Sequence, residues 1–114
     1  GDGSMLMHLG SLRTQGAFGT SNFKHILLNN GCHESVGGQE TFVKRTNFTG
    51  LSKMLGYKHV FKIANKRDLK RNLKKFLKSK GPSFLEIKIK TGTLSNLIRP
   101  KKFLKIKENF YKSK

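Results

Sequence analysis

Hydrophobic positions in the first part of the chain follow first the period of a helix and then the run of a buried strand. Residues 4–16 carry apolar side chains at helical spacing, and residues 23–28 form a short apolar run typical of a buried parallel strand. Residues 31–46 are polar and show no period. This part of the chain therefore predicts a helix, a strand and a long loop.

The same order continues further along the chain. Asn47 is a candidate N-cap for a helix that ends at Gly56, and residues 59–64 have the composition of a strand. A second helix begins after Asn65 and carries a single apolar stripe. Residues 84–90 alternate apolar and charged side chains, as a strand with one exposed face does. This alternation predicts an α/β fold that contains part of a doubly wound parallel sheet.

Charge divides the chain into two parts. The whole chain carries 24 Lys and Arg against 6 Asp and Glu, for a formal net charge of +18, and most basic residues lie after residue 43. Residues 92–114 form a basic C-terminal tail without a clear pattern, so residues 1–91 are the predicted domain. The pI near 10.5 makes a basic nucleic-acid-binding module a remote alternative. The excess of lysine over arginine argues against it, and we expect no nucleic-acid partner.

Several classes of protein are excluded by simple features of the sequence. No apolar run approaches the roughly 20 residues that a membrane span needs, so we expect no membrane partner. Cys32 is the only cysteine, which excludes an internal disulfide. The first residues do not resemble a secretory or transit segment, and we expect a cytoplasmic protein.

Two polar segments stand where a parallel α/β sheet binds its ligands. Gly1-Asp2-Gly3-Ser4 opens the first predicted helix, and Asn29-Asn30-Gly31 follows the first predicted strand. A helix start offers free backbone N–H groups to a phosphate. Asp2 and Asn30 can offer oxygen ligands to Mg²⁺, and the carbonyl of Cys32 can add a third. Taken singly, both segments are also ordinary turn sequences.

The two segments together resemble the diphosphate-binding motif of thiamine diphosphate enzymes, which is Gly-Asp-Gly, a spacer in the mid-twenties and Asn-Asn. The runs GDGSMLMHLGSLRTQG, NFKHILLNNGCHESVGGQETF, GPSFLEIKIKTG and LIRP resemble the phosphonopyruvate decarboxylase family over residues 1 to about 100. The resemblance implies decarboxylation of 3-phosphonopyruvate, a small anionic 2-oxo acid, to phosphonoacetaldehyde and CO₂ with thiamine diphosphate and Mg²⁺. The alternatives are a sulfopyruvate decarboxylase-type subunit or another thiamine diphosphate-dependent 2-oxo acid decarboxylase.

The resemblance also implies a set of site residues. Asp2, Asn30 and the backbone carbonyl of Cys32 match the metal ligands. The residues that match cofactor contacts are Gly1, Gly3, Ser4 and Asn30. In the loop that follows, His33 is a candidate catalytic residue that could donate to an anionic substrate or carry a proton, with a plain surface histidine as the alternative. The candidate substrate-loop residues are Ser35 and Gln39. The other histidines are expected to pack or to be structural: His8, His25 and His59.

The family fold pairs two α/β domains, and the resemblance places this chain in the later part of the diphosphate-binding domain. It implies a missing pyrimidine-binding domain, either upstream in the same polypeptide or on a separate subunit, and a homo-oligomer with sites between chains. The glutamate that activates the cofactor belongs to that other domain, and neither Glu34 nor Glu40 matches it. We therefore expect this polypeptide alone to decarboxylate nothing.

Overall fold

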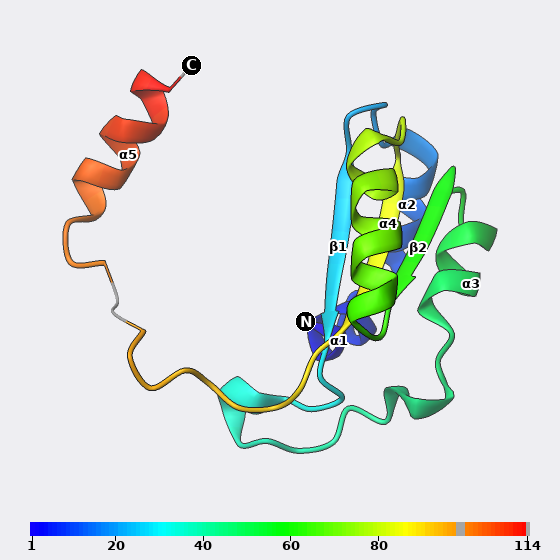
Figure 1. The fold of residues 1–114 in the computed structure, drawn as a ribbon, viewed down its shortest axis with the longest axis horizontal. Coiled ribbons are helices and arrows are strands. Elements are labelled where there is room, and N and C mark those ends of the chain that lie inside the picture. Colours follow the sequence, from blue (N-terminus) through cyan, green and yellow to red (C-terminus); the bar gives the residue numbers. More distant parts are fainter. Residues whose placement is uncertain (98–99, 114) are drawn as a thin grey trace.

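The computed structural model describes residues 1–97 and 100–113, so the Ile98-Arg99 part of the LIRP run lies outside the described residues. Its elements, in chain order, are α1 (Asp2–Met7), α2 (Gly10–Phe18), β1 (Lys24–Asn29), the 3₁₀ turns η1 (Glu34–Val36) and η2 (Val43–Arg45), α3 (Phe48–Met54), β2 (His59–Ile63), α4 (Lys66–Lys78), β3 (Ser83–Lys88) and α5 (Phe103–Lys112). Figure 1 shows a sheet between helices, with α5 set apart from it at the end of an extended segment.

The described strands form one parallel sheet in the order β1-β3-β2. Because the strands are parallel, their carboxyl ends meet at the same edge of the sheet, next to α1 (Figure 1). The predicted α/β fold with a parallel sheet is therefore confirmed. The last strand in the sequence, β3, lies in the middle of the sheet, so both of its edges are paired. Phe84 and Leu85 of β3 are buried in separate apolar clusters.

The central position of β3 corrects one expectation. The alternation in residues 84–90 predicted a strand with one exposed face, yet Glu86 is only 2% exposed. Its side chain lies on the face covered by the first three helices, where Leu27 of β1 is the register partner of Glu86. Sequence alternation alone could not place this strand in the middle of the sheet, because strand order depends on contacts distant in sequence.

Each face of the sheet has its own apolar core. On one face, Leu12 of α2, Phe48 of α3 and Phe84 of β3 belong to a cluster that is fully buried or nearly so. On the other face, Phe76 of α4 packs against Leu85 of β3. Leu73 and Phe76 of the apolar stripe predicted for α4 therefore face the sheet, whereas Leu69 and Leu77 are 41% and 62% exposed. The lysines on the rest of that helix form its solvated side.

The helix predicted over residues 4–16 is broken in two. His8 has φ −126° and ψ 42°, outside the helical region, and the helix resumes at Gly10. Met5 and Leu12, which lie on either side of this break, belong to the same core. His8 is exposed, so its expected packing beside Leu9 is wrong.

Both asparagine caps are confirmed. The side chain of Asn47 accepts a hydrogen bond from the backbone N–H of Gly50 at 3.0 Å, and that of Asn65 accepts from Asp68 at 2.9 Å. Each satisfies a backbone N–H that the first turn of a helix leaves without a partner. The turn at Gly56 has φ +106°, a conformation that favours glycine, so the predicted end of this helix is also confirmed.

The strand β1 is only half covered. Its run of apolar residues predicted burial on both faces, but Ile26 is 49% and Leu28 47% exposed. The physical reason is that α4 packs on β2 and β3 and leaves this face of β1 bare. The edge of β1 away from β3 also has no neighbouring strand in the described chain.

The basic tail contains a helix that the sequence pattern did not predict. Helix α5 spans Phe103–Lys112, and its apolar side chains are exposed, with Phe103 at 74% and Leu104 at 77%. Across residues 1–97 and 100–113, the helices are too short or too polar to span a membrane.

Candidate functional site

A cavity of about 270 Å³ lies at the carboxyl end of β1, beside the start of α1. The residues predicted to bind metal or cofactor all line it: Gly1, Asp2, Gly3, Ser4, Asn30 and Cys32. His33 and Ser35 also line the cavity, whereas Gln39 does not; its side chain lies against Gly37. The fold therefore brings together two segments that are far apart in the sequence.

Asp2 is buried in the first turn of α1, where the positive end of the helix dipole favours a carboxylate. It is 1% exposed, and its Oδ2 accepts a hydrogen bond from the hydroxyl of Thr41 at 2.5 Å. Sequence reasoning missed Thr41. A single threonine in a polar loop without periodicity carries no signal that it will return to the start of the chain.

Both polar atoms of the Asn30 side-chain amide make hydrogen bonds. Its Nδ2 donates to Glu34 Oε2 at 2.8 Å, and its Oδ1 accepts from the backbone N–H of Cys32 at 3.2 Å. Glu34 Oε1 also accepts from the backbone N–H of Gly92. Glu34 therefore ties the segment after β3 to the predicted metal ligand, a role that sequence analysis did not assign to it.

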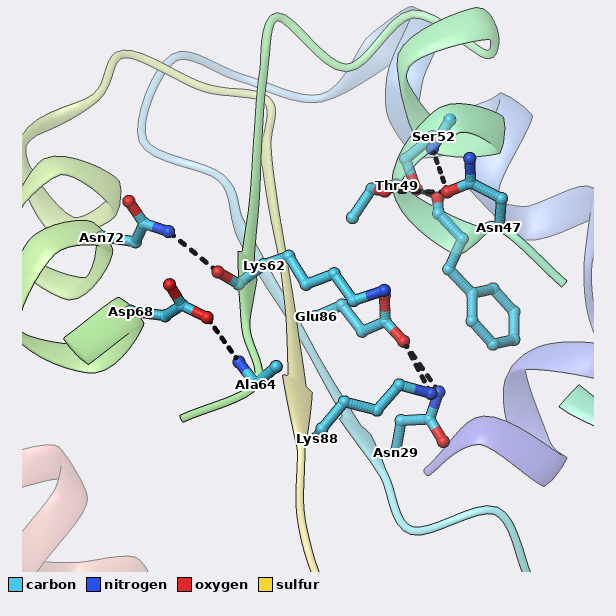
Figure 2. Close-up of polar contacts among 12 residues, drawn as sticks. Asn29, Asn47, Thr49, Ser52, Lys62, Ala64, Asp68, Asn72, Glu86 and Lys88 are labelled. Carbon is cyan, nitrogen blue, oxygen red and sulfur yellow. Dashed lines mark hydrogen bonds and ion pairs between the residues drawn. The ribbon is translucent and has the colours of Figure 1, made fainter. Parts of the chain in front are cut away.

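Beneath the site, a buried polar cluster joins β1 to β3 (Figure 2). Asn29 Nδ2 donates to Glu86 Oε1 at 2.8 Å, and both residues are 2% exposed. Lys88 Nζ lies 3.3 Å and Lys62 Nζ 3.7 Å from the carboxylate of Glu86. Because Asn29 directly precedes Asn30, this cluster fixes the end of the strand from which the predicted ligand projects.

His33 lies directly over the start of α1. A Cβ atom built on Gly3 would lie 2.3 Å from Cε1 of the His33 ring, so only glycine allows this approach without a shift of the ring. The ring therefore lies between the Gly-Asp-Gly segment and the loop. This position at the cavity is compatible with the catalytic role expected for His33 and does not test it.

His25 lies away from the cavity, as expected for a structural histidine. Its Nδ1 is 2.7 Å from the Tyr57 hydroxyl, and its ring packs against Phe84 with ring centroids 5.1 Å apart. Burial lowers the pKa of His25 below its usual 6.5 and raises the pKa of Tyr57 to about 12. Both groups therefore stay neutral at pH 7.

The lowered pKa of His25 predicts a stability that depends on pH. Between the folded pKa of His25 and 6.5, the unfolded chain binds more protons than the folded chain, so stability falls as the pH drops through this window. We expect the melting temperature of the complete enzyme to fall between pH 7.5 and 5.5, and His25→Gln to reduce that fall. His8→Gln, which changes an exposed histidine, serves as the control. Equal pH slopes in the two variants would contradict the prediction.

The donor set of the cavity suits a hard cation. Among the described residues, no group of three or more His, Cys, Asp and Glu side chains is placed to hold a metal. One carboxylate, one amide oxygen and one backbone carbonyl are instead oxygen donors of the kind that Mg²⁺ shares with substrate or cofactor phosphates. Asp2, Asn30 and Cys32 therefore fit the predicted ion.

Known proteins are similar to most of this chain. The family model described as "Thiamine pyrophosphate enzyme, C-terminal TPP binding domain" matches residues 1–87. Phosphonopyruvate decarboxylase from Streptomyces viridochromogenes is 40% identical over 101 residues, which cover 89% of this chain and 25% of that protein. The same enzyme from Streptomyces hygroscopicus is 39% identical over 101 residues, with the same coverage.

A third relative is sulfopyruvate decarboxylase subunit beta from Methanothermobacter thermautotrophicus. It is 34% identical over 92 residues, which cover 81% of this chain and 47% of that subunit. The chain thus spans a quarter to about half of the length of these relatives. The chain belongs to the thiamine pyrophosphate enzymes and matches their C-terminal TPP-binding domain, with phosphonopyruvate and sulfopyruvate decarboxylases among its relatives.

Proposed function

We propose that the enzyme containing this chain decarboxylates 3-phosphonopyruvate to phosphonoacetaldehyde and CO₂ in the cytoplasm, with thiamine diphosphate and Mg²⁺. The observation that carries the proposal is that Asp2 and Asn30, from opposite ends of a helix–strand unit, line one cavity. The names of the Streptomyces relatives support the phosphonate substrate.

In this proposal the chain supplies the anchor for the cofactor. Asp2, Asn30 and the carbonyl of Cys32 hold Mg²⁺, and the backbone at Gly1 and Gly3, with Ser4, faces the diphosphate. Thiamine diphosphate, when bound, supplies the carbanion stabilisation that decarboxylation needs. The protein residues bind and orient the diphosphate end, and the buried position of Asp2 keeps its carboxylate out of bulk water.

The substrate end of the cavity has two candidate residues from the same loop. His33 and Ser35 line the cavity and could donate hydrogen bonds to an anionic substrate. Gln39 lies outside the cavity and would need a movement of the loop to reach it. We therefore favour His33 and Ser35 over Gln39 as substrate-binding residues.

The rest of the enzyme has a place to attach on this chain. A Cβ atom built on Gly1 would lie 3.8 Å from the carbonyl oxygen of Leu28. Any residue that precedes Gly1 would therefore lie near the carboxyl end of β1. The free edge of β1 and the exposed Ile26 and Leu28 suit a further strand and helix. We propose that this face adjoins the remaining part of the enzyme, which includes the pyrimidine-binding domain, within a homo-oligomer.

A sulfopyruvate decarboxylase-type subunit is the second candidate, because the Methanothermobacter relative is named as one subunit of such an enzyme. The two substrates differ in their anionic group, a phosphonate against a sulfonate.

A comparison of substrates tests the proposal. With the complete enzyme, we expect kcat/KM for 3-phosphonopyruvate to exceed that for sulfopyruvate by tenfold or more. A phosphonate can carry a second negative charge that a sulfonate lacks, and a site that binds this charge favours the phosphonate by about 1.4 kcal/mol or more. Pyruvate, which has neither the phosphonate nor the sulfonate group, is the control substrate. A preference for sulfopyruvate would support the second candidate, and turnover of neither would contradict both.

A further inference from the structure

The hydroxyl of Thr41 makes a buried hydrogen bond to the carboxylate of Asp2. The two residues lie 39 positions apart in the sequence and are both buried, with 5% and 1% exposed. Thr41 Oγ1 donates to Asp2 Oδ2 at 2.5 Å. This is the one hydrogen bond that a side chain donates to the carboxylate among the described residues, and Asp2 also lines the cavity.

The backbone that carries Thr41 is tied to the segment that carries the other predicted ligands. The N–H of Thr41 donates to the carbonyl of Gly31 at 3.0 Å, and Glu40 pairs with Cys32 in an antiparallel bridge. Gly31 has φ +77°, which lets the chain turn directly after Asn30. Thr41 therefore links the two segments that supply the ligands: its backbone is fixed to one segment and its hydroxyl to the other.

We propose that Thr41 is a positioning residue that presets the Asp2 carboxylate for Mg²⁺. The proposal rests on the proposed function of the cavity. A carboxylate can rotate about its last torsion, which is broad and roughly two-fold. The hydrogen bond from Thr41 holds one oxygen and so limits this rotation, which would leave the other oxygen set for the ion. Partners of this kind that orient a metal ligand typically change metal affinity by about 10- to 100-fold when they are removed.

Two substitutions of Thr41 separate its hydroxyl from its shape. Thr41→Val keeps the branched shape and removes the donor, while Thr41→Ser keeps the donor and removes a methyl group. The measurement uses the complete enzyme, stripped of cofactor and then dialysed against a Mg²⁺ series with excess thiamine diphosphate. The amount of thiamine diphosphate retained is measured at each Mg²⁺ concentration, and the concentration that gives half of the maximal retention is the Mg²⁺ midpoint. The melting temperature of the stripped enzyme shows whether the variant is folded.

We expect Thr41→Val to raise the Mg²⁺ midpoint about 10- to 100-fold and Thr41→Ser to leave it within about threefold of the wild type. Retention by the valine variant should recover at high Mg²⁺, because the defect is in metal affinity and not in the fold. If the valine variant does not fold, Thr41→Ala compared with Thr41→Ser gives the same contrast between absence and presence of the hydroxyl.

The outcomes separate this proposal from the function on which it rests. A wild-type enzyme that retains no thiamine diphosphate at any Mg²⁺ concentration overturns the proposed function. A wild-type enzyme that does retain it, with equal midpoints for the valine and serine variants, overturns the role of Thr41 alone. Equal losses in the two variants, without recovery at high Mg²⁺, assign Thr41 a purely structural role and also overturn the proposal.

Discussion

Asp2→Asn should remove Mg²⁺-dependent binding of thiamine diphosphate from the complete enzyme. The substitution keeps the size of the side chain and the acceptor for Thr41, but it removes the charge of the only carboxylate among the predicted metal ligands. We expect the Mg²⁺ midpoint for cofactor retention to rise more than about a hundredfold, beyond the range typical of residues that only orient a ligand. Decarboxylation should be lost at ordinary Mg²⁺ concentrations.

The matched control is Asp68→Asn, the same change at the other aspartate of the chain. Asp68 lies in the first turn of α4, where it accepts from the backbone N–H of Ala64 and pairs with Arg71. It does not line the cavity, so its change should leave the Mg²⁺ midpoint unaltered. Cofactor retention by Asp2→Asn at the wild-type midpoint would remove Asp2 from the metal site.

Glu86→Ala should destabilise the centre of the sheet. The substitution leaves the buried amide of Asn29 without its acceptor, and it leaves Lys62 and Lys88 without their carboxylate. A buried polar group that loses its partner costs about 1–3 kcal/mol. The two lysines are 51% and 39% exposed and can turn to water, so the main loss comes from Asn29 and from the space left by the side chain.

We expect the opening free energy of β1 and β3, measured by hydrogen exchange of the complete enzyme, to fall by about 3 kcal/mol. Glu86→Gln keeps an oxygen for Asn29 and should lose less. Glu108→Ala on α5 is the surface control, with an expected change below about 0.5 kcal/mol. Exchange rates in β1 and β3 that match those of the Glu108 variant would show that the polar cluster does not hold the strands together.

The elements with a local cause could be predicted from the sequence. The caps at Asn47 and Asn65 bond to backbone groups only three residues away, so the sequence pattern is enough to find them. The break at His8 and the burial of Glu86 could not be found in this way. The burial of Glu86 follows from the position of β3 between two strands, and the break at His8 falls within a stretch whose apolar spacing is that of one continuous helix.

In the candidate site too, the sequence predicted some residues and missed others. The motif residues Asp2 and Asn30 were identified because their types and spacing resemble a known family, and they do line one cavity. Thr41 and Glu34, which hold these side chains, were not identified. The contact of Thr41 with Asp2 spans 39 positions and depends on how a polar loop without periodicity folds back. Glu34 lies only four positions after Asn30, but no helical or strand period in this loop marks the two as partners.

By itself, the sequence determined the family, the α/β alternation and the segments that form the cavity, because these depend on residue types at fixed spacings. Only the tertiary structure decided the strand order, the bare face of β1 and the hydrogen bond from Thr41 that holds Asp2. The physical reason is that helical periods and caps act within a few residues, whereas burial and hydrogen bonding at the site join groups up to 58 positions apart.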